Sequence, residues 1–207
     1  MDAERSRKSV LIVAAGCSAG SELAKGFAAK GAQVIVVDHV ERRALALVRR
    51  SPRFIESLTL DPLRPGQCRR LGEIWADTPL DLLVHLHPLR SPRRIGAAVA
   101  AIPALTRALG RGLREGEGLV IVACRAPEQG APPEAHAFDA ALTALAPHMQ
   151  ADAGECGQVA VLRLAAGAGG AALMRAAGML TDQGQAGPRG AVLNVPEAGD
   201  KPRGQGD

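Results

Sequence analysis

The amino-acid sequence predicts an α/β fold of the Rossmann type, a single domain built on a doubly wound parallel sheet of about seven strands. A continuous apolar run at residues 10–15 indicates a strand with both faces covered, as in parallel sheets. One helix-length segment later, a second apolar run ends in Asp38, 18 residues after Gly20. A carboxylate near this distance from a small-residue turn is typical of dinucleotide-binding βαβ units. Apolar runs then alternate with helical patterns along the chain, which favours a parallel sheet.

The turn after the first strand is built from small residues. Its candidate cofactor-binding positions are Ala14, Gly16, Ser18 and Gly20. Small side chains let the backbone approach a pyrophosphate closely and let the helix pack tightly on the strand. Alanine and serine tolerate a positive φ poorly, so the special backbone angles of such turns are less well served than the packing. Two interpretations stay open: a phosphate-binding turn, and a turn kept small only for packing.

The other elements follow from apolar periodicity and from glycine and proline signals. Gly31 is placed to end the first helix, and Ser91 and Pro92 are placed to start the fourth as N-cap and first residue. Pro103 is expected to kink that fourth helix. Helices are expected at 21–30, 41–50, 67–76, 95–113, 135–149 and 171–180, and further strands at 54–60, 80–86, 119–124, 159–164 and 190–195. The expected domain covers 1–196, and the polar segment 197–207 is expected to be a disordered tail.

Composition excludes several classes of partner. The chain has 207 residues, a formal net charge of +4 and only 2% aromatic residues, so it lacks stacking platforms and we expect no nucleic-acid binding. No apolar run approaches the length of a membrane span, so we expect no membrane partner. The four cysteines are far apart and form no CxxC pair. This spacing predicts reduced thiols, a cytoplasmic location and no metal site.

The segment from Met1 to Cys17 superficially resembles a bacterial lipoprotein signal, because basic residues and an apolar run precede a cysteine. The apolar run is short for a signal peptide, and Asp2 and Glu4 lie in the leader. The residues after Cys17 continue the βαβ pattern. We therefore interpret this segment as the first strand and turn.

Four segments together resemble the short-chain dehydrogenase/reductase family over nearly the whole chain. They are VLIVAAGCSAGSELAKGFAAKGAQVIVVD at 10–38, DLLVHLHP at 81–88, GLVIVACR at 118–125 and RGAVLNV at 189–195. The resemblance implies a Rossmann fold that binds NAD(P). It also implies that Asp38 holds the ribose diol, which favours NAD over NADP, and that Asp61 contacts the adenine.

The departures from that family concern its catalytic residues. Its TGxxxGxG turn falls on Val13, Ala14, Ser18 and Gly20, of which only Gly20 matches, and its NNAG motif falls on His85, Leu86, His87 and Pro88. The catalytic serine position falls on Ala123 or Cys124. The YxxxK pair falls on Ala135 and Asp139, or on His136 and Ala140.

Composition leaves no substitute for the missing proton donor. The chain has no tyrosine, and no lysine lies between Lys30 and Lys201. Carbonyl reduction of this type uses a phenol whose pKa a lysine lowers, so that a proton moves as hydride moves. The family's long substrate lid after the sixth strand is also missing. The sequence therefore predicts a pseudoenzyme with no catalytic residue of its own and with NAD bound weakly or not at all.

Two forms of an enzymatic alternative stay open. One is an NAD(H)-dependent oxidoreductase with an atypical site, in which His85 and His87 act with Asp139 or His136, or Cys124 acts as a nucleophile with His136 as base. The other is an oxidoreductase whose site is completed by another chain. A simpler interpretation is that the histidines are hydrogen-bonded or partly exposed residues without a catalytic role, and that Cys124 is a small buried side chain that fills space.

The helices at 95–113 and 135–149 are expected to form an interface. Each has more apolar residues than one sheet-facing stripe requires: Ile95, Val99, Ile102, Leu105 and Leu109 in the first, and Phe138, Leu142, Leu145 and Met149 in the second. In the family that the chain resembles, these two helices pair across a two-fold axis. We therefore expect a homo-oligomer, or a hetero-oligomer with a relative from that family that the chain holds in shape. The alternative is a monomer in which alanine only raises helix propensity.

Overall fold

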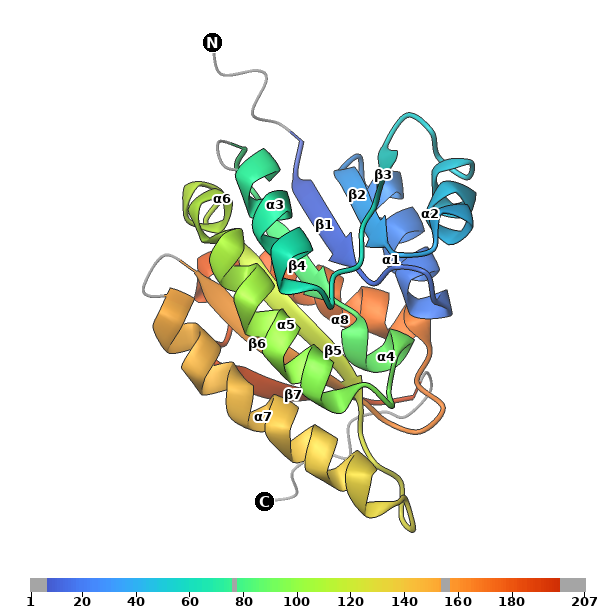
Figure 1. The fold of residues 1–207 in the computed structure, drawn as a ribbon, viewed down its shortest axis with the longest axis vertical. Helices are drawn as coiled ribbons and strands as arrows, with labels where there is room; N and C mark the ends of the chain where they lie inside the picture. Colours follow the sequence, from blue (N-terminus) through green and yellow to red (C-terminus); the bar gives the residue numbers. More distant parts are fainter. Residues whose placement is uncertain (1–6, 76–77, 154–156, 198–207) are drawn as a thin grey trace, which may run out of the picture.

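The computed structural model describes residues 7–75, 78–153 and 157–197 (Figure 1). Strands and helices alternate along the chain. The strands are β1 (Ser9–Val13), β2 (Gln33–Asp38), β3 (Ile55–Thr59), β4 (Leu82–His85), β5 (Leu119–Arg125), β6 (Gln158–Leu164) and β7 (Ala191–Val195). The helices are α1 (Ser18–Ala29), α2 (Glu41–Val48), α3 (Pro65–Trp75), α4 (His87–Arg90), α5 (Ile95–Ala108), α6 (Gly110–Glu115), α7 (Pro133–Ala153), α8 (Gly170–Gln183) and the 3₁₀ turn η2 (Gly184–Ala186).

All seven strands form one parallel sheet, in the order β3-β2-β1-β4-β5-β6-β7. The strand order reverses between β1 and β4, which makes their carboxyl ends the topological switch point where such sheets bind ligands. The predicted α/β class and the predicted doubly wound sheet of seven strands are therefore confirmed.

Two layers of helices cover the sheet (Figure 1). One apolar core lies between the sheet and α1, α2 and α8, and the other between the sheet and α3, α5, α6 and α7. Alternate residues of β1 enter the two cores: Val10 and Ile12 enter the first, and Leu11 and Val13 the second. Trp75, the single tryptophan, is buried at the end of α3 in the second core and packs against α6 at Gly112.

Helix α1 shows how the sequence positions the candidate site. Its predicted apolar face is buried against the sheet at Leu23 and Phe27. Gly31 follows the helix with a φ of 83°, a left-handed conformation that glycine adopts without strain, so its predicted role as the end of the helix is confirmed. At the other end, a Cβ on Gly20 would lie 2.1 Å from the Ala15 carbonyl oxygen. The first turn of the helix therefore lies directly on the end of β1.

The structure corrects three expectations between β4 and β5. The predicted 95–113 helix is two helices, α5 and α6, which are separated by Leu109, the C-cap of α5 and the N-cap of α6. Ser91 and Pro92 do not start α5: Arg94 is its N-cap, and Ser91 is the C-cap of α4. The short helix α4 was not predicted, because four residues give no periodic signal.

No helix in the described part of the chain is both long enough and apolar enough to cross a membrane. The expected tail lies outside the described residues except for Glu197, whose carboxylate lies beside Gly167.

Candidate functional site

The candidate cofactor turn lies at the switch point of the sheet, between β1 and α1. Ala14 has a φ of 61°, in the left-handed region that residues other than glycine rarely adopt. The turn therefore has the special backbone angle that the sequence left in doubt, reached here by an alanine. Ser18 is the exposed first residue of α1, and it is not among the residues with a positive φ.

Asp38 lies at the end of β2, and its side chain is turned inward. The residue has no exposed surface, which is rare for a carboxylate. The Gly16 N–H donates to Oδ2 at 2.8 Å, and the Val40 N–H donates to Oδ1 at 2.9 Å. A Cβ on Gly16 would lie 2.5 Å from Oδ2, so a glycine is required for this approach. Asp38 therefore binds the candidate cofactor turn of its own chain.

Two arginines lie over this contact. Arg90, the last residue of α4, places Nε 3.4 Å from Oδ2 of Asp38, and its side chain is 16% exposed. Arg43, from α2, places Nη1 3.5 Å from the Gly16 carbonyl oxygen. The turn, α2 and α4 are thus connected through Gly16 and Asp38.

Asp61 follows β3 and lines a concavity of about 620 Å³ between the end of that strand and α3. Its Oδ1 accepts the Leu63 N–H at 3.1 Å, and its Oδ2 lies 3.3 Å from Nε of Arg64. The side chain is still 22% exposed, so Asp61 faces this concavity in a way that Asp38 does not.

His85 and His87 are buried next to each other, with ring centroids 5.5 Å apart. Nε2 of His85 lies 3.0 Å from the Thr106 hydroxyl, which itself donates to the Ile102 carbonyl oxygen. The hydroxyl is therefore the acceptor and Nε2 the donor. Nδ1 of His85 and both ring nitrogens of His87 have no hydrogen-bond partner among the described residues. Burial lowers the pKa of His87 to about 4 and holds the pKa of His85 well below 6.5.

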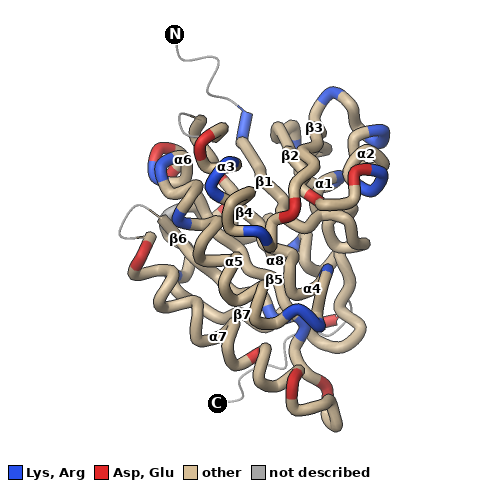
Figure 2. The backbone as a smooth tube through the Cα atoms, in the orientation of Figure 1, with Lys and Arg blue, Asp and Glu red and all other residues tan. Residues whose placement is uncertain are grey.

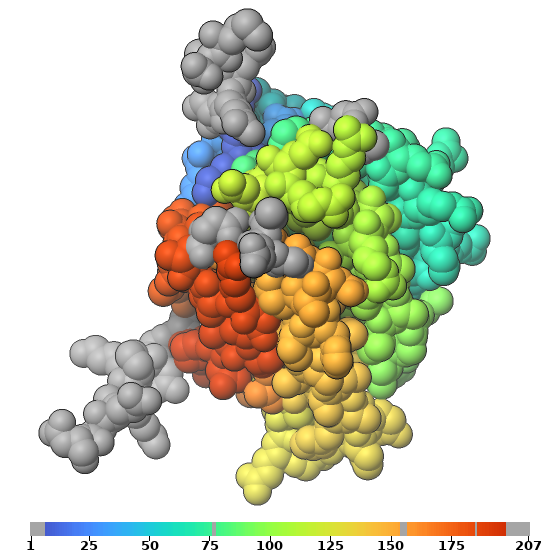
Figure 3. Space-filling view, turned by 90° about the vertical axis from the view of Figure 1, so that its left-hand side faces the viewer, coloured from blue at the N-terminus to red at the C-terminus, as the bar shows by residue number. Residues whose placement is uncertain are grey.

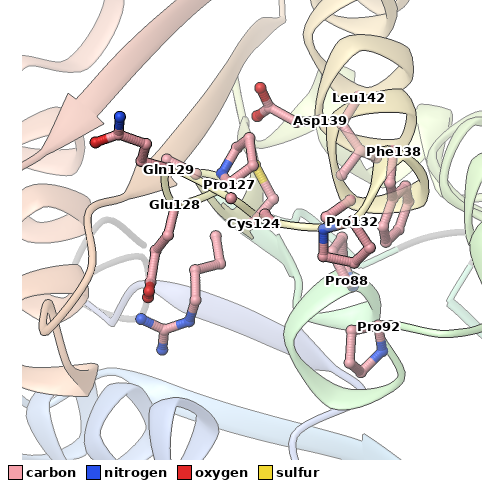
Figure 4. A pocket seen from close by; sticks show the side chains of 15 residues that line it. Pro88, Pro92, Cys124, Pro127, Glu128, Gln129, Pro132, Phe138, Asp139 and Leu142 are labelled. Carbon is pink, nitrogen blue, oxygen red and sulfur yellow. The ribbon is translucent and has the colours of Figure 1, made fainter.

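A cavity of about 460 Å³ lies beyond the carboxyl end of β5 (Figure 4). Helix α7 forms one wall, the β5–α7 loop another, and Pro88 and Pro92 from the α4 region a third. Cys124 lies at the base of this cavity. Ala123, the alternative for the family's serine position, is buried in the core on the opposite face of the sheet.

Helix α7 carries both candidate registers of the YxxxK positions, together with the residues that line the cavity. Phe138 and Leu142, four residues apart, line the cavity and are 7% and 1% exposed. His136 and Ala140 are exposed and do not line the cavity. Ala135 and Asp139 also line the cavity but are less buried. The pair most deeply placed is therefore a phenylalanine and a leucine, neither of which can move a proton.

The expected alternative sites are not brought together. Burial, with the nearby Asp139 charge, raises the pKa of the Cys124 thiol to about 12, so it is not a thiolate at neutral pH. His136 lies two residues before the inward-facing Phe138, on a different side of the helix, and cannot serve Cys124 as a base. Asp139 forms a double hydrogen bond with Arg163 of β6, at 2.7 and 2.8 Å. In the described part of the chain, no group of three or more His, Cys, Asp or Glu residues could hold a metal ion.

No family model matches the sequence, and no curated protein matches it. Solved structures match its fold. A 3-ketoacyl-(acyl-carrier-protein) reductase from Brucella melitensis complexed with NADH has a TM-score of 0.76 at 18% identity, over 91% of this chain and 96% of the other. A hydroxysteroid dehydrogenase from Escherichia coli has a TM-score of 0.76 at 19% identity, over 91% of this chain and 95% of the other. A gluconate 5-dehydrogenase from Burkholderia cenocepacia in complex with NADP and tartrate has a TM-score of 0.72 at 21% identity, over 91% of this chain and 93% of the other.

The chain has the fold of these oxidoreductases. Two of the three structures contain a nicotinamide dinucleotide. In this chain, only some of the residues at the switch point of the sheet are suited to binding a nicotinamide dinucleotide. Gly20 keeps the close approach of helix and strand, and Ala14 supplies the bend of the turn. The Asp38 carboxylate is fully buried beside Arg90 in this structure, so it is not open to a ribose.

Proposed function

We propose that the chain is a degenerate member of the short-chain dehydrogenase/reductase family that has no catalytic residues and acts as a structural or regulatory partner subunit of an active dehydrogenase. The observation that supports this most strongly is the wall of the 460 Å³ cavity. Cys124, Phe138 and Leu142 stand at its base, and none of them is an acid or base at neutral pH.

The loss of chemistry follows from these side chains. Hydride transfer to a carbonyl leaves an alkoxide unless a proton is supplied at the same time. A phenylalanine ring has no hydroxyl, a leucine has no charge to lower a neighbouring pKa, and the Cys124 thiol holds its proton. Two carboxylates line the cavity: Asp139 of α7, which is bound by Arg163, and Glu128 of the β5–α7 loop. This set of groups favours a binding role over carbonyl reduction.

We therefore expect no turnover of NADH or NADPH above background with a broad panel of ketones and alcohols. The assay is the absorbance of the reduced cofactor, with an active 3-ketoacyl reductase of the same fold as the positive control. Turnover that disappears when Cys124 or His136 is replaced would refute the proposal and establish an atypical site. Turnover that appears only when a second protein is added would establish a partner-completed site.

The surface proposed for the partner is the outer face of α5 and α7. These helices lie side by side (Figure 1), and the middle of each is free of charged residues (Figure 2). In Figure 3, α7 (gold) lies at the surface between α5 and α6 (green) and β7 (red). Most of the large apolar residues expected there are buried in the chain's own core: Ile102, Leu105, Leu109, Phe138, Leu142 and Met149. The exposed positions are small ones, such as Ala100, Ala137, Ala140 and Ala144.

A flat surface of small residues lets helices of two subunits approach closely. We expect Ala140→Arg to dissociate the assembly, because a long charged side chain would separate the two helices. Sedimentation gives the mass, and circular dichroism checks that helix content is kept. Ala29→Arg, at an exposed alanine of α1, is the matched control. A wild-type chain that sediments as a monomer, alone and with active relatives, would contradict the partner role.

A further inference from the structure

We propose that Arg90 and Asp38 form an internal clamp that closes the ribose position of the fold and connects its three surrounding segments without a nucleotide. The inference rests on the weak nucleotide binding expected above, and it names the residue that causes it.

The first step is the occupancy of the Asp38 carboxylate. Such a group has about four lone-pair sites, two on each oxygen. The Gly16 N–H occupies one site on Oδ2 and the Val40 N–H one on Oδ1. These two backbone donors leave one site on each oxygen, which is what the two hydroxyls of a ribose diol require.

The second step is the position of Arg90. Its Nε donates to Oδ2 at 3.4 Å, the same oxygen that accepts the Gly16 N–H. His39 Nδ1 lies 3.6 Å from Oδ1, which is too long for a hydrogen bond. Among the described residues, Arg90 is therefore the side chain that both pairs with the charge of the carboxylate and uses a site that the diol needs. Since Asp38 has no exposed surface, a ribose cannot reach it while Arg90 stays in place.

The third step concerns what the clamp holds. Asp38 ends β2, Gly16 lies between β1 and α1, and Arg90 ends α4, which follows β4 (Figure 1). These three segments meet at the carboxyl edge of the sheet, where backbone hydrogen bonds already join the turn to β2 (Ala15 N–H to the Val37 carbonyl) and the start of α4 to β1 (Leu86 N–H to the Val13 carbonyl). The ion pair adds a side-chain connection from α4 to β2 across the position that a ribose would take.

The test is nucleotide binding by the Arg90→Ala protein, measured by titration calorimetry with NAD and with NADP. We expect the wild-type chain to give no saturable heat up to about 1 mM NAD, and Arg90→Ala to bind NAD about tenfold more tightly or better, as expected for a hydroxyl that donates to a free carboxylate. NAD should also raise the melting temperature of Arg90→Ala and leave that of the wild type unchanged. Arg93→Ala, which removes the same charge from an exposed position three residues later, is the control and should bind no NAD.

Two further variants keep the test decisive. Arg90→Met retains the stem of the side chain without a donor, in case truncation to alanine prevents folding. Adding Asp38→Asn to Arg90→Ala should abolish the gained binding. Wild-type binding equal to that of Arg90→Ala, or no binding by either folded Arg90 variant, would overturn the clamp. Equal affinity of Arg90→Ala for NADP and NAD would also overturn it, because a 2′-phosphate cannot donate to Asp38.

These outcomes are separable from the proposed function. If Arg90→Ala binds NAD but reduces no ketone, both proposals hold. If the wild type turns over a substrate, the partner role fails whichever way the binding titrations come out.

Discussion

Replacing Gly20 by alanine should destabilise the chain more than any other single methyl group placed in the first βαβ unit. The new Cβ would lie 2.1 Å from the Ala15 carbonyl oxygen and 2.8 Å from the Ala15 Cα. Both atoms belong to the backbone of the turn that follows β1, so they cannot move aside by changing rotamer. The helix must shift away from the sheet instead, and we expect a loss of about 3 kcal/mol in the free energy of unfolding.

Urea unfolding followed by far-ultraviolet circular dichroism measures this loss. Gly66→Ala is the matched control, because Gly66 lies in α3 with no atom within 4 Å of its added Cβ. That control should be stable or slightly stabilised, since alanine favours the helix. Equal stability of Gly20→Ala and Gly66→Ala would show that α1 does not lie as close to β1 as described.

Acid should unfold the chain through its buried histidine pair. Burial lowers the pKa of His87 to about 4, against 6.5 for an exposed imidazole, although the Pro62 carbonyl and Asp61 partly oppose the shift. The pKa of His85 is lowered well below 6.5 by its burial and by the charge of His87. Between pH 6.5 and pH 4 the unfolded chain therefore binds more protons than the folded one, so stability falls as the pH falls. For His87 alone the loss over that interval is about 3 kcal/mol.

The measurement is the urea midpoint at several values between pH 7 and pH 4. His87→Leu removes one titrating imidazole while keeping an apolar side chain, and it should flatten the pH dependence. His148→Gln, at an exposed position of α7, should leave it unchanged. Since the carboxylates are common to all three proteins, only the difference between them reports the histidine. A pH profile that is the same for His87→Leu and the wild type would refute this origin of the acid sensitivity.

The fold could be predicted from the sequence because each central strand is an apolar run buried on both faces. Such a run is visible without any tertiary information, as at residues 10–13 of β1 and 119–124 of β5. The break at Leu109 and the helix α4 were not visible. In the first case leucines continue a helical pattern through the break, at Leu105, Leu109 and Leu113, and in the second the element is only four residues long.

The candidate site was predictable in position but not in orientation. Spacing places Asp38 at the end of β2, yet nothing in the sequence indicates that its carboxylate turns toward Gly16, because that depends on the N–H groups of the folded turn. Arg90 lies 52 residues away in sequence and was not expected there. Phe138 and Leu142 were identified as apolar residues of α7, but their place in the cavity depends on the start of the helix at Pro133, two residues before its expected start.

The burial of Trp75 makes the chain its own optical reporter. Because the chain has no tyrosine and one tryptophan, this indole gives nearly all of the absorbance near 295 nm and nearly all of the fluorescence excited there. It lies between the end of α3 and Gly112 of α6, away from the carboxyl edge of the sheet and from the outer face of α7. The emission maximum of Trp75 therefore reports whether the contact between α3 and α6 is intact. Binding of a ligand or partner at another surface should leave this emission maximum unchanged.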